Sequence, residues 1–222
     1  MDEDVEVYQV APYSKKDKLI KVDKKNYFKD VDIKYFTVPE LQKLLNGAKN
    51  QYHRLIYTLL YETGGRIEEV RSLRFKDLDT SVNRLKIKTL KQRRSGDVYR
   101  FIYLSDRLVS MILAHRVDSS LTDTDFIMAK KPGRNPIIRE AVTRALKLDV
   151  INTLGKDYID KAHPHAFRHS RAIHMLDAGI GITTVQSFLG HRNIINTVIY
   201  LRHSHNDMAE AIKSKMPVFY WG

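Results

Sequence analysis

The sequence predicts a mainly α-helical fold with one small antiparallel β-sheet, which belongs to the α+β class. Two observations support this prediction. Beyond residue 35, apolar residues recur at helical spacing over most of the chain, and this spacing changes to alternation only between residues 84 and 104. The length of 222 residues also suffices for one principal hydrophobic core with a small appendage.

The first two ordered elements are predicted to be helices. The segment YFTVPELQKLL begins one of them, because Thr37 and Glu40 have the spacing of a capping box. The segment QYHRLIYTLLYETGG predicts the other helix, which ends at Gly64 and Gly65 because glycine readily adopts the backbone conformation that closes a helix. Arg66 follows this turn and opens the short helix RIEEVRSL.

The change of period indicates a β-hairpin. Leu85 and Ile87 alternate with Lys86 and Lys88, the residues RSGD form a turn, and VYRFIYL supplies the returning strand. The remaining apolar pattern is helical, and helices are expected at about 106–117, 139–154, 165–178, 183–189, 194–203 and 206–215.

One main domain is expected. The residues before it are charged, include the lysine-rich stretch SKKDKLIKVDKK and have no amphipathic period, so we interpret them as a linker or arm. The predicted organisation is an arm at residues 1–34, a main domain at residues 35–205, and a C-terminal helix and tail at residues 206–222.

The charge balance favours an anionic partner. The chain has 38 Lys and Arg residues against 26 Asp and Glu residues, a formal net charge of +12, which indicates nucleic acid first and an acidic membrane surface second. The absence of cysteine excludes disulfides, Cys-ligated zinc and thiol chemistry. No apolar run approaches the roughly 18 residues of a membrane span, and the acidic start is not a signal peptide, so a soluble cytoplasmic protein is expected.

The segment HPHAFRHSRAIHML contains four of the nine histidines. His165 and His169 have the i,i+4 spacing of a zinc-binding pair, but the segment lacks Asp and Glu at ligand spacing, and Arg168 would repel a cation, so no metal is expected. His165 and Arg168 at i,i+3 instead suit a phosphate. A third possibility is a solvated basic face, and we interpret His169 and His174 as structural histidines.

A tyrosine near the end of the pattern is also a candidate site residue. The segment TTVQSFLGHRNIINTVIYLRH ends one helix at a glycine, presents His191 in the turn and begins another helix. On that helix Tyr200 shares a face with Asn196 and Thr197, so it is predicted to contact something polar. An exposed structural tyrosine is the alternative.

Four segments together resemble the catalytic domain of the tyrosine recombinase family, also called phage integrases, which includes the Xer-type resolvases. The segments are GGRIEEVRSL, HAFRHSRA, LGHRN and VIYLRH, and the match covers roughly residues 35–210. The family has an Arg with an acid three residues later, a hairpin lysine, a His-x-x-Arg pair, a Leu-Gly-His and a Tyr nine residues beyond that His. The matching residues here are Arg66, Glu69, His165, Arg168, His191 and Tyr200. The resemblance implies the catalytic-domain fold of this family.

The resemblance also implies a reaction on DNA. Arg66 and Arg168 would hold the nonbridging phosphate oxygens, and Tyr200 would attack phosphorus to give a 3'-phosphotyrosyl link. His165 would be the general base, and His191 would hydrogen-bond the phosphate. A hairpin lysine would protonate the departing 5' oxygen. The implied reaction uses no metal, no ATP and no other cofactor.

Two lysines are candidates for this general acid. Lys88 is followed by threonine as in some integrases, whereas strand alternation puts Lys91 on the face of Leu85 and Ile87. Alternation favours Lys91, and a bulge in the hairpin would reverse that choice. Other cations are expected to contact backbone phosphates, which gives affinity and not sequence choice. Those chosen are Lys86, Lys88, Arg93, Arg94, Lys130, Lys131 and Arg134, and Arg84 and Arg100 belong to the same hairpin set.

The expected partners are double-stranded DNA carrying a recombination site and further copies of the chain, assembled as a tetramer, with no membrane partner. Relatives usually have an N-terminal helical domain that closes around DNA, so the chain is either a fragment or a short single-domain member. The tail is expected to pack on a neighbouring subunit. The alternative is that it folds back onto its own domain. A type IB topoisomerase-like nicking enzyme and a non-catalytic basic DNA-binding module are the alternative functions.

Overall fold

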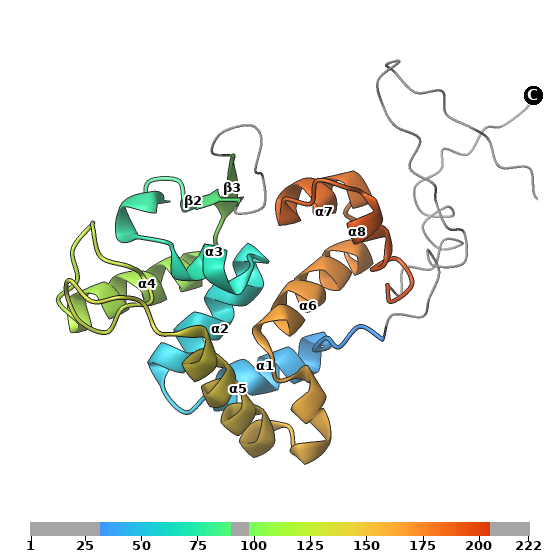
Figure 1. The fold of residues 1–222 in the computed structure, drawn as a ribbon, viewed down its shortest axis with the longest axis horizontal. Helices are drawn as coiled ribbons and strands as arrows, with labels where there is room; N and C mark the ends of the chain where they lie inside the picture. The colour runs from blue at the N-terminus through green and yellow to red at the C-terminus, as the bar shows by residue number, and fades with distance from the viewer. Residues whose placement is uncertain (1–31, 90–97, 205–222) are drawn as a thin grey trace, which may run out of the picture. The chain divides into compact units, whose positions relative to one another are not determined.

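The computed structural model describes residues 32–89 and 98–204. The described residues from Ile33 onward belong to one compact unit. Within the described ranges the α-helices are α1 (Val38–Gly47), α2 (Gln51–Thr63), α3 (Ile67–Arg71), α4 (Asp106–Asp118), α5 (Arg139–Thr153), α6 (Pro164–Asp177), α7 (Ile182–Leu189) and α8 (Ile195–Val198). The strands are β1 (Leu78–Asp79), β2 (Arg84–Lys88) and β3 (Tyr99–Tyr103), and the 3-10 helices are Phe75–Asp77 and Lys156–Lys161. The predicted α+β class is confirmed (Figure 1).

The small sheet is antiparallel, in the order β1-β2-β3. Leu85 and Ile87 of β2 are fully buried, whereas Lys86 and Lys88 are exposed, as the alternation predicts. Strand β1 was not predicted, because a strand of two residues is too short to show an alternating pattern. The predicted RSGD turn lies outside the described residues.

The predicted helix boundaries at α1 and α2 agree with the structure. The Thr37 backbone N–H donates to Glu40 Oε2 at 2.9 Å, and the Glu40 N–H donates to Thr37 Oγ1 at 3.4 Å, which completes the capping box. Helix α2 ends at Gly64, whose φ of 54° is left-handed. The carbonyl of Gly64 also accepts a hydrogen bond from Arg168 in the candidate site.

Helix α6 is the central element around which the site is arranged. It packs against α2 on one side and reaches α7 near its C-terminal end (Figure 1). Phe167 of α6 packs between the rings of Phe36 and Tyr57, with centroid distances of 5.4 and 5.6 Å. A second apolar cluster joins the later part of α6 to α7, and it includes Ala172, Ile173, Leu176, Val185, Leu189 and Tyr200.

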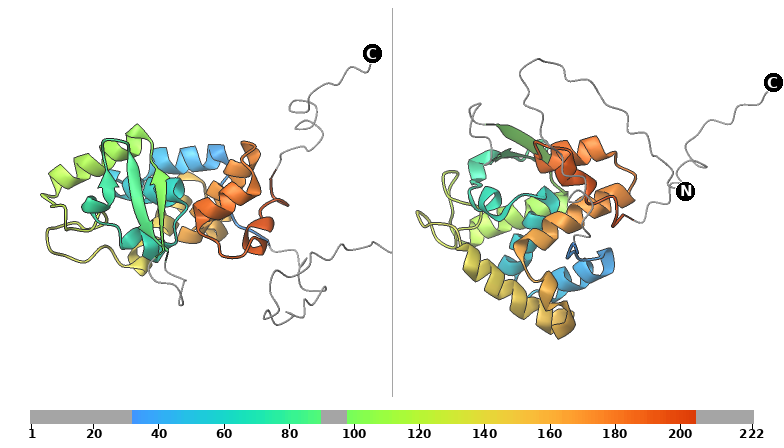
Figure 2. Two further views of the ribbon diagram at one scale, coloured as in Figure 1. Left: turned by 90° about the horizontal axis from the view of Figure 1, so that it is seen from above. Right: turned by 45° about the vertical axis from the view of Figure 1, so that its right-hand side comes forward.

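The helix predicted at residues 194–203 is wrong in extent. Only Ile195–Val198 is helical, and turns follow to residue 203. The end of α7 lies beside β3, as the right view of Figure 2 shows, and a Cβ added to Gly190 would approach Arg100 Nη1 at 3.2 Å. This contact brings the sheet to the same place as α6 and α7. The predicted helix at 206–215 lies outside the described residues.

Candidate active site

The first component of the site is a carboxylate between two guanidinium groups. Arg66 precedes α3, and its Nη1 donates to Glu69 Oε1 at 2.9 Å, while its backbone N–H donates to Oε2 at 3.1 Å. Arg100 Nη2 of β3 donates to Glu69 Oε2 at 2.7 Å. Burial alone would raise the pKa of Glu69, but the charge of Arg100 and then the hydrogen bonds from Arg66 outweigh it, so the pKa is lowered. The ionised carboxylate therefore fixes both arginines.

Arg168 is held by the ends of two helices. Its Nη1 donates to the Gly64 carbonyl at 2.7 Å, and its Nη2 donates to the Leu189 carbonyl at 2.9 Å. Both carbonyls lie at helix C-termini, where the partial negative charge of the helix favours a cation. Burial, and next the charge of Arg66, lowers the pKa of Arg168 to about 10, so the side chain stays charged at neutral pH.

His165 and Arg168, which the sequence predicts to serve one phosphate, differ in exposure. His165 is exposed, but Arg168 is only 1% exposed. The physical reason is that α6 is covered on more than one side, so a residue one turn from a surface position is still enclosed by α2 and α7.

Tyr200 is buried, which corrects the prediction that it lies on a polar face with Asn196. It is 2% exposed and belongs to the apolar cluster beside α6 and α7, whereas Asn196 is exposed. Its hydroxyl nevertheless has a polar partner, because Oη lies 3.0 Å from His169 Nδ1. Burial raises the pKa of Tyr200, although the charges of Arg168 and Arg66 act in the opposite direction.

His191 also lies beside the ring of Tyr200. The two rings are nearly parallel, at 11°, with centroids 6.4 Å apart. His191 Nδ1 is 2.9 Å from Thr197 Oγ1, which fixes the orientation of the imidazole. Burial, followed by the charges of Arg168 and Arg66, lowers the pKa of His191 to about 3, so the ring is neutral at physiological pH. A neutral imidazole donates one hydrogen bond.

The structure thus brings most of the predicted site residues together. Arg168, Arg66 and His165 all act to lower the pKa of His191, and Arg168 and Arg66 act on the pKa of Tyr200. The proposed general acid Lys91 lies outside the described residues, as do Arg93 and Arg94. Lys86 and Lys88 are on the exposed face of the sheet, and Lys130, Lys131 and Arg134 are exposed in the loop before α5.

One residue of this site, Arg100, differs from its sequence prediction. Arg100 was expected to contact DNA phosphates, but it is 9% exposed and bonded to Glu69. The sequence could have predicted this burial, because Arg100 lies two residues before the apolar Ile102 and so shares its inward face. In the structure Arg100 is the β3 partner of the buried Ile87. His169 was interpreted as structural, and its contact with Tyr200 could not be read from spacing alone.

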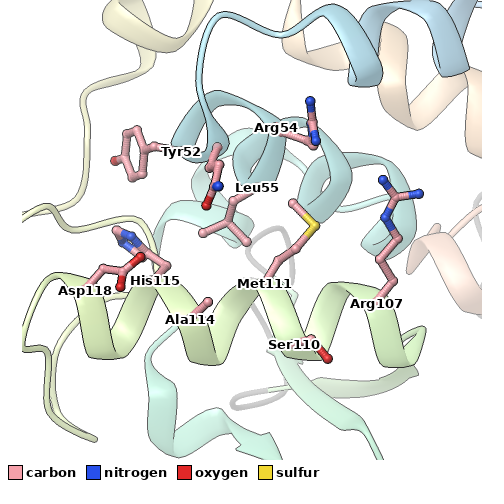
Figure 3. Close-up of a pocket in the computed structure, with 10 residues that line it drawn as sticks. Tyr52, Arg54, Leu55, Arg107, Ser110, Met111, Ala114, His115 and Asp118 are labelled. Atoms are coloured by element: carbon pink, nitrogen blue, oxygen red, sulfur yellow. The ribbon is translucent and has the colours of Figure 1, made fainter.

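A separate pocket lies between α2 and α4, with a volume of about 630 Å³. Tyr52 and Leu55 of α2 line it on one side, and Met111 and His115 of α4 line it on the other (Figure 3). None of the predicted site residues contributes to its lining. This pocket is therefore not part of the candidate active site.

Two searches of the described residues bear on other classes of site. Over residues 32–89 and 98–204, no group of three or more His, Asp or Glu side chains is arranged to hold a metal ion. In the same ranges, none of the helices combines the length and apolarity needed to cross a membrane.

The fold and the convergent motif residues define the class of protein. Residues 34–207 match the phage integrase family, and the chain belongs to this family. It is 30% identical over 179 residues to a tyrosine recombinase of Pseudothermotoga lettingae and 31% identical over 185 residues to the tyrosine recombinase XerA of Pyrococcus furiosus. These alignments cover 80% and 81% of this chain but 59% and 61% of the relatives, so the chain spans about three fifths of their length.

Solved structures agree with the family in fold. XerA recombinase superposes with a TM-score of 0.61 at 23% identity, covering 83% of this chain and 66% of the other. The catalytic domain of bacteriophage HP1 integrase gives a TM-score of 0.57 at 21% identity, over 84% of this chain and 97% of that domain. XerH bound to palindromic difH substrate, in a post-cleavage complex, gives a TM-score of 0.67 at 20% identity. That match covers 82% of this chain and 53% of the XerH chain. The predicted tyrosine recombinase catalytic-domain fold is confirmed.

Proposed function

We propose that this domain cleaves and rejoins DNA at specific sites through a covalent 3'-phosphotyrosyl intermediate. One observation carries the proposal: Tyr200 packs in the same buried cluster as Leu189, whose carbonyl accepts a 2.9 Å hydrogen bond from Arg168, so the Tyr200 hydroxyl lies in the field of Arg168 and Arg66. A phosphodiester resists attack because its negative charge repels nucleophiles and its alkoxide leaving group is poor. Two guanidinium groups beside a tyrosine reduce this repulsion, because they supply fixed positive charge where a phosphate would bind.

In the proposed step, Tyr200 Oη forms a bond to phosphorus and the bond from phosphorus to the 5' oxygen breaks. His165 accepts the phenolic proton, and a hairpin lysine, Lys91 or Lys88, gives a proton to the departing oxygen. Arg66 and Arg168 stabilise the added charge on the nonbridging oxygens. The covalent link retains the energy of the original bond, so a second DNA strand reverses the step without ATP or a metal ion.

His191 is proposed to donate a hydrogen bond to the phosphate. Support comes from its neutral ring, which has one N–H to donate, and from the bond to Thr197 that fixes its orientation. Glu69 is proposed to act through Arg66, whose guanidinium and backbone it bonds. The carboxylate holds the arginine in place without touching the phosphate itself.

The partner proposed for the basic surface is double-stranded DNA. Support comes from the net charge of +12 and from the exposure of Lys86, Lys88, Lys130, Lys131 and Arg134. The XerH structure was solved with its difH substrate, which favours the same partner here. We propose that the protein acts in the cytoplasm as a tetramer on paired DNA sites. The proposed domains are an arm at 1–34, a catalytic domain at 35–205 and a tail at 206–222.

The test is capture of the covalent adduct. A DNA duplex selected by binding from a random library is synthesised with a nick at successive positions, so that a short cleaved strand diffuses away and religation is prevented. We expect the wild-type protein to form a DNA adduct resistant to denaturation, in buffer containing a metal chelator. Tyr200→Phe should form none. An adduct that persists in Tyr200→Phe, or that requires added divalent metal, would contradict the mechanism. Relaxation of plasmids without strand exchange would indicate a topoisomerase-like enzyme instead.

A further inference from the structure

The residue that contacts the tyrosine hydroxyl is outside the set of proposed catalytic residues. His169 follows Arg168 directly on α6, and its Nδ1 lies 3.0 Å from Tyr200 Oη. The two rings also touch, with centroids 5.5 Å apart at 57°. We propose that His169 is a positioning residue for the nucleophile. Its hydrogen bond holds the phenolic oxygen of Tyr200 beside Arg66 and Arg168. The inference rests on the proposed function and adds a residue to it.

The surroundings of His169 restrict where its ring can go. The edge of the His165 ring lies against it, with centroids 4.5 Å apart and planes at 85°. The His169 ring thus contacts the rings of both His165 and Tyr200. Because Arg168 is anchored to two helix ends, the same turn of α6 fixes the guanidinium and the imidazole together. One short helical segment therefore sets the position of the phosphate-binding group relative to the nucleophile.

A general-base role for His169 is disfavoured by its environment. Burial, with smaller contributions from neighbouring histidines and Arg168, lowers the pKa of His169 to about 3. The pKa of Tyr200 is raised by burial, so transfer of the phenolic proton to His169 would be strongly uphill. His169 remains neutral between pH 5 and 8. Its contribution is then geometric, since a hydroxyl held in one orientation reacts faster than one that samples several.

Helix α6 supplies a matched control at His174. Its Nδ1 lies 3.0 Å from Tyr61 Oη, it is also partly buried, and burial lowers its pKa as well. His169→Phe and His174→Phe therefore each remove one bond between a histidine and a tyrosine from the same helix. His169→Asn is the conservative variant, because an asparagine amide offers either a donor or an acceptor near the position of Nδ1.

The experiment measures the single-turnover rate of adduct formation on the nicked duplex from pH 5.5 to 8.5, with DNA affinity measured separately by titration. For His169→Phe we expect a rate about 10- to 100-fold lower at unchanged DNA affinity, from loss of orientation. His169→Asn should stay within about 5-fold of wild type, since one neutral hydrogen bond is retained. His174→Phe should react at the wild-type rate. The shape of the pH profile should be the same in all four proteins.

Three results would overturn the inference while leaving the proposed function intact. A wild-type rate in His169→Phe would show that the bond has no role. An equal rate loss in His174→Phe would assign the effect to general destabilisation of α6. Loss of the acidic limb of the pH profile in both His169 variants would make His169 the base. If the wild-type protein itself forms no adduct, the proposed function fails, and this inference fails with it.

Discussion

Glu69→Gln should destabilise the domain far more than a carboxylate-to-amide change normally does. The Glu69 carboxylate is fully buried, and from the described residues Arg66 and Arg100 it accepts hydrogen bonds at 2.7, 2.9 and 3.1 Å. Glutamine keeps one acceptor oxygen and turns an N–H group toward the remaining donors. Arg66 and Arg100 then face each other with reduced compensation.

The expected loss follows from these contacts. Removing one partner of a buried ion pair costs about 3–5 kcal/mol, because the remaining charge is left uncompensated. Glutamine retains part of the hydrogen bonding, and each charged hydrogen bond that is lost contributes about 1.5–3 kcal/mol. We therefore expect the free energy of unfolding to fall by about 3 kcal/mol. The measurement is equilibrium unfolding in urea at pH 7, read by circular dichroism.

The adjacent residue provides the control. Glu68 forms an ion pair with Arg71 on the exposed side of α3, and its side chain is 49% exposed. Exposed pairs of this kind contribute about 0–1 kcal/mol, so Glu68→Gln should change stability little. If Glu69→Gln costs no more than Glu68→Gln, the buried bridge between Arg66 and Arg100 does not stabilise the domain, and the reasoning is refuted.

Three further predictions follow from the same geometry. Gly64→Ala should lower the free energy of unfolding in urea by about 2 kcal/mol, because φ is +54° and the new Cβ would lie 2.9 Å from the Phe188 ring. The rate of adduct formation should fall too, since the Gly64 carbonyl holds Arg168. Tyr57→Phe should cost about 1–2 kcal/mol by leaving the buried Asp149 short of a 2.8 Å hydrogen bond, with no change in adduct rate. Since the pKa of Glu69 is lowered on folding, its stabilising contribution is fully present above the ordinary pKa of about 4.3 and is lost as pH falls through the lower folded pKa. The stability difference between wild type and Glu69→Gln should accordingly shrink in acid, and a difference that grows in acid would contradict this assignment.

Elements with a local chemical signal were predictable from the sequence. The capping box at Thr37, the glycine stop at Gly64 and the alternation at Leu85 each depend on residues a few positions apart, and each agrees with the structure. The motif spacing likewise identified residues that the fold brings together. Local rules failed where burial depends on distant segments: Tyr200 is covered by α6 and α7, and no pattern around residue 200 contains that information.

Arg168 shows why stability and chemistry are difficult to separate in this site. Its guanidinium closes the C-termini of α2 and α7 and is also the proposed phosphate ligand. Arg168→Ala would leave both carbonyls without this donor and would remove the buried charge, so a loss of activity in that variant would not identify a catalytic role. Residues that touch Tyr200 without joining helices are better probes, because their replacement leaves the connection between α2, α6 and α7 in place. His169 meets that condition, since the bond it makes inside the site is to Tyr200, the proposed nucleophile.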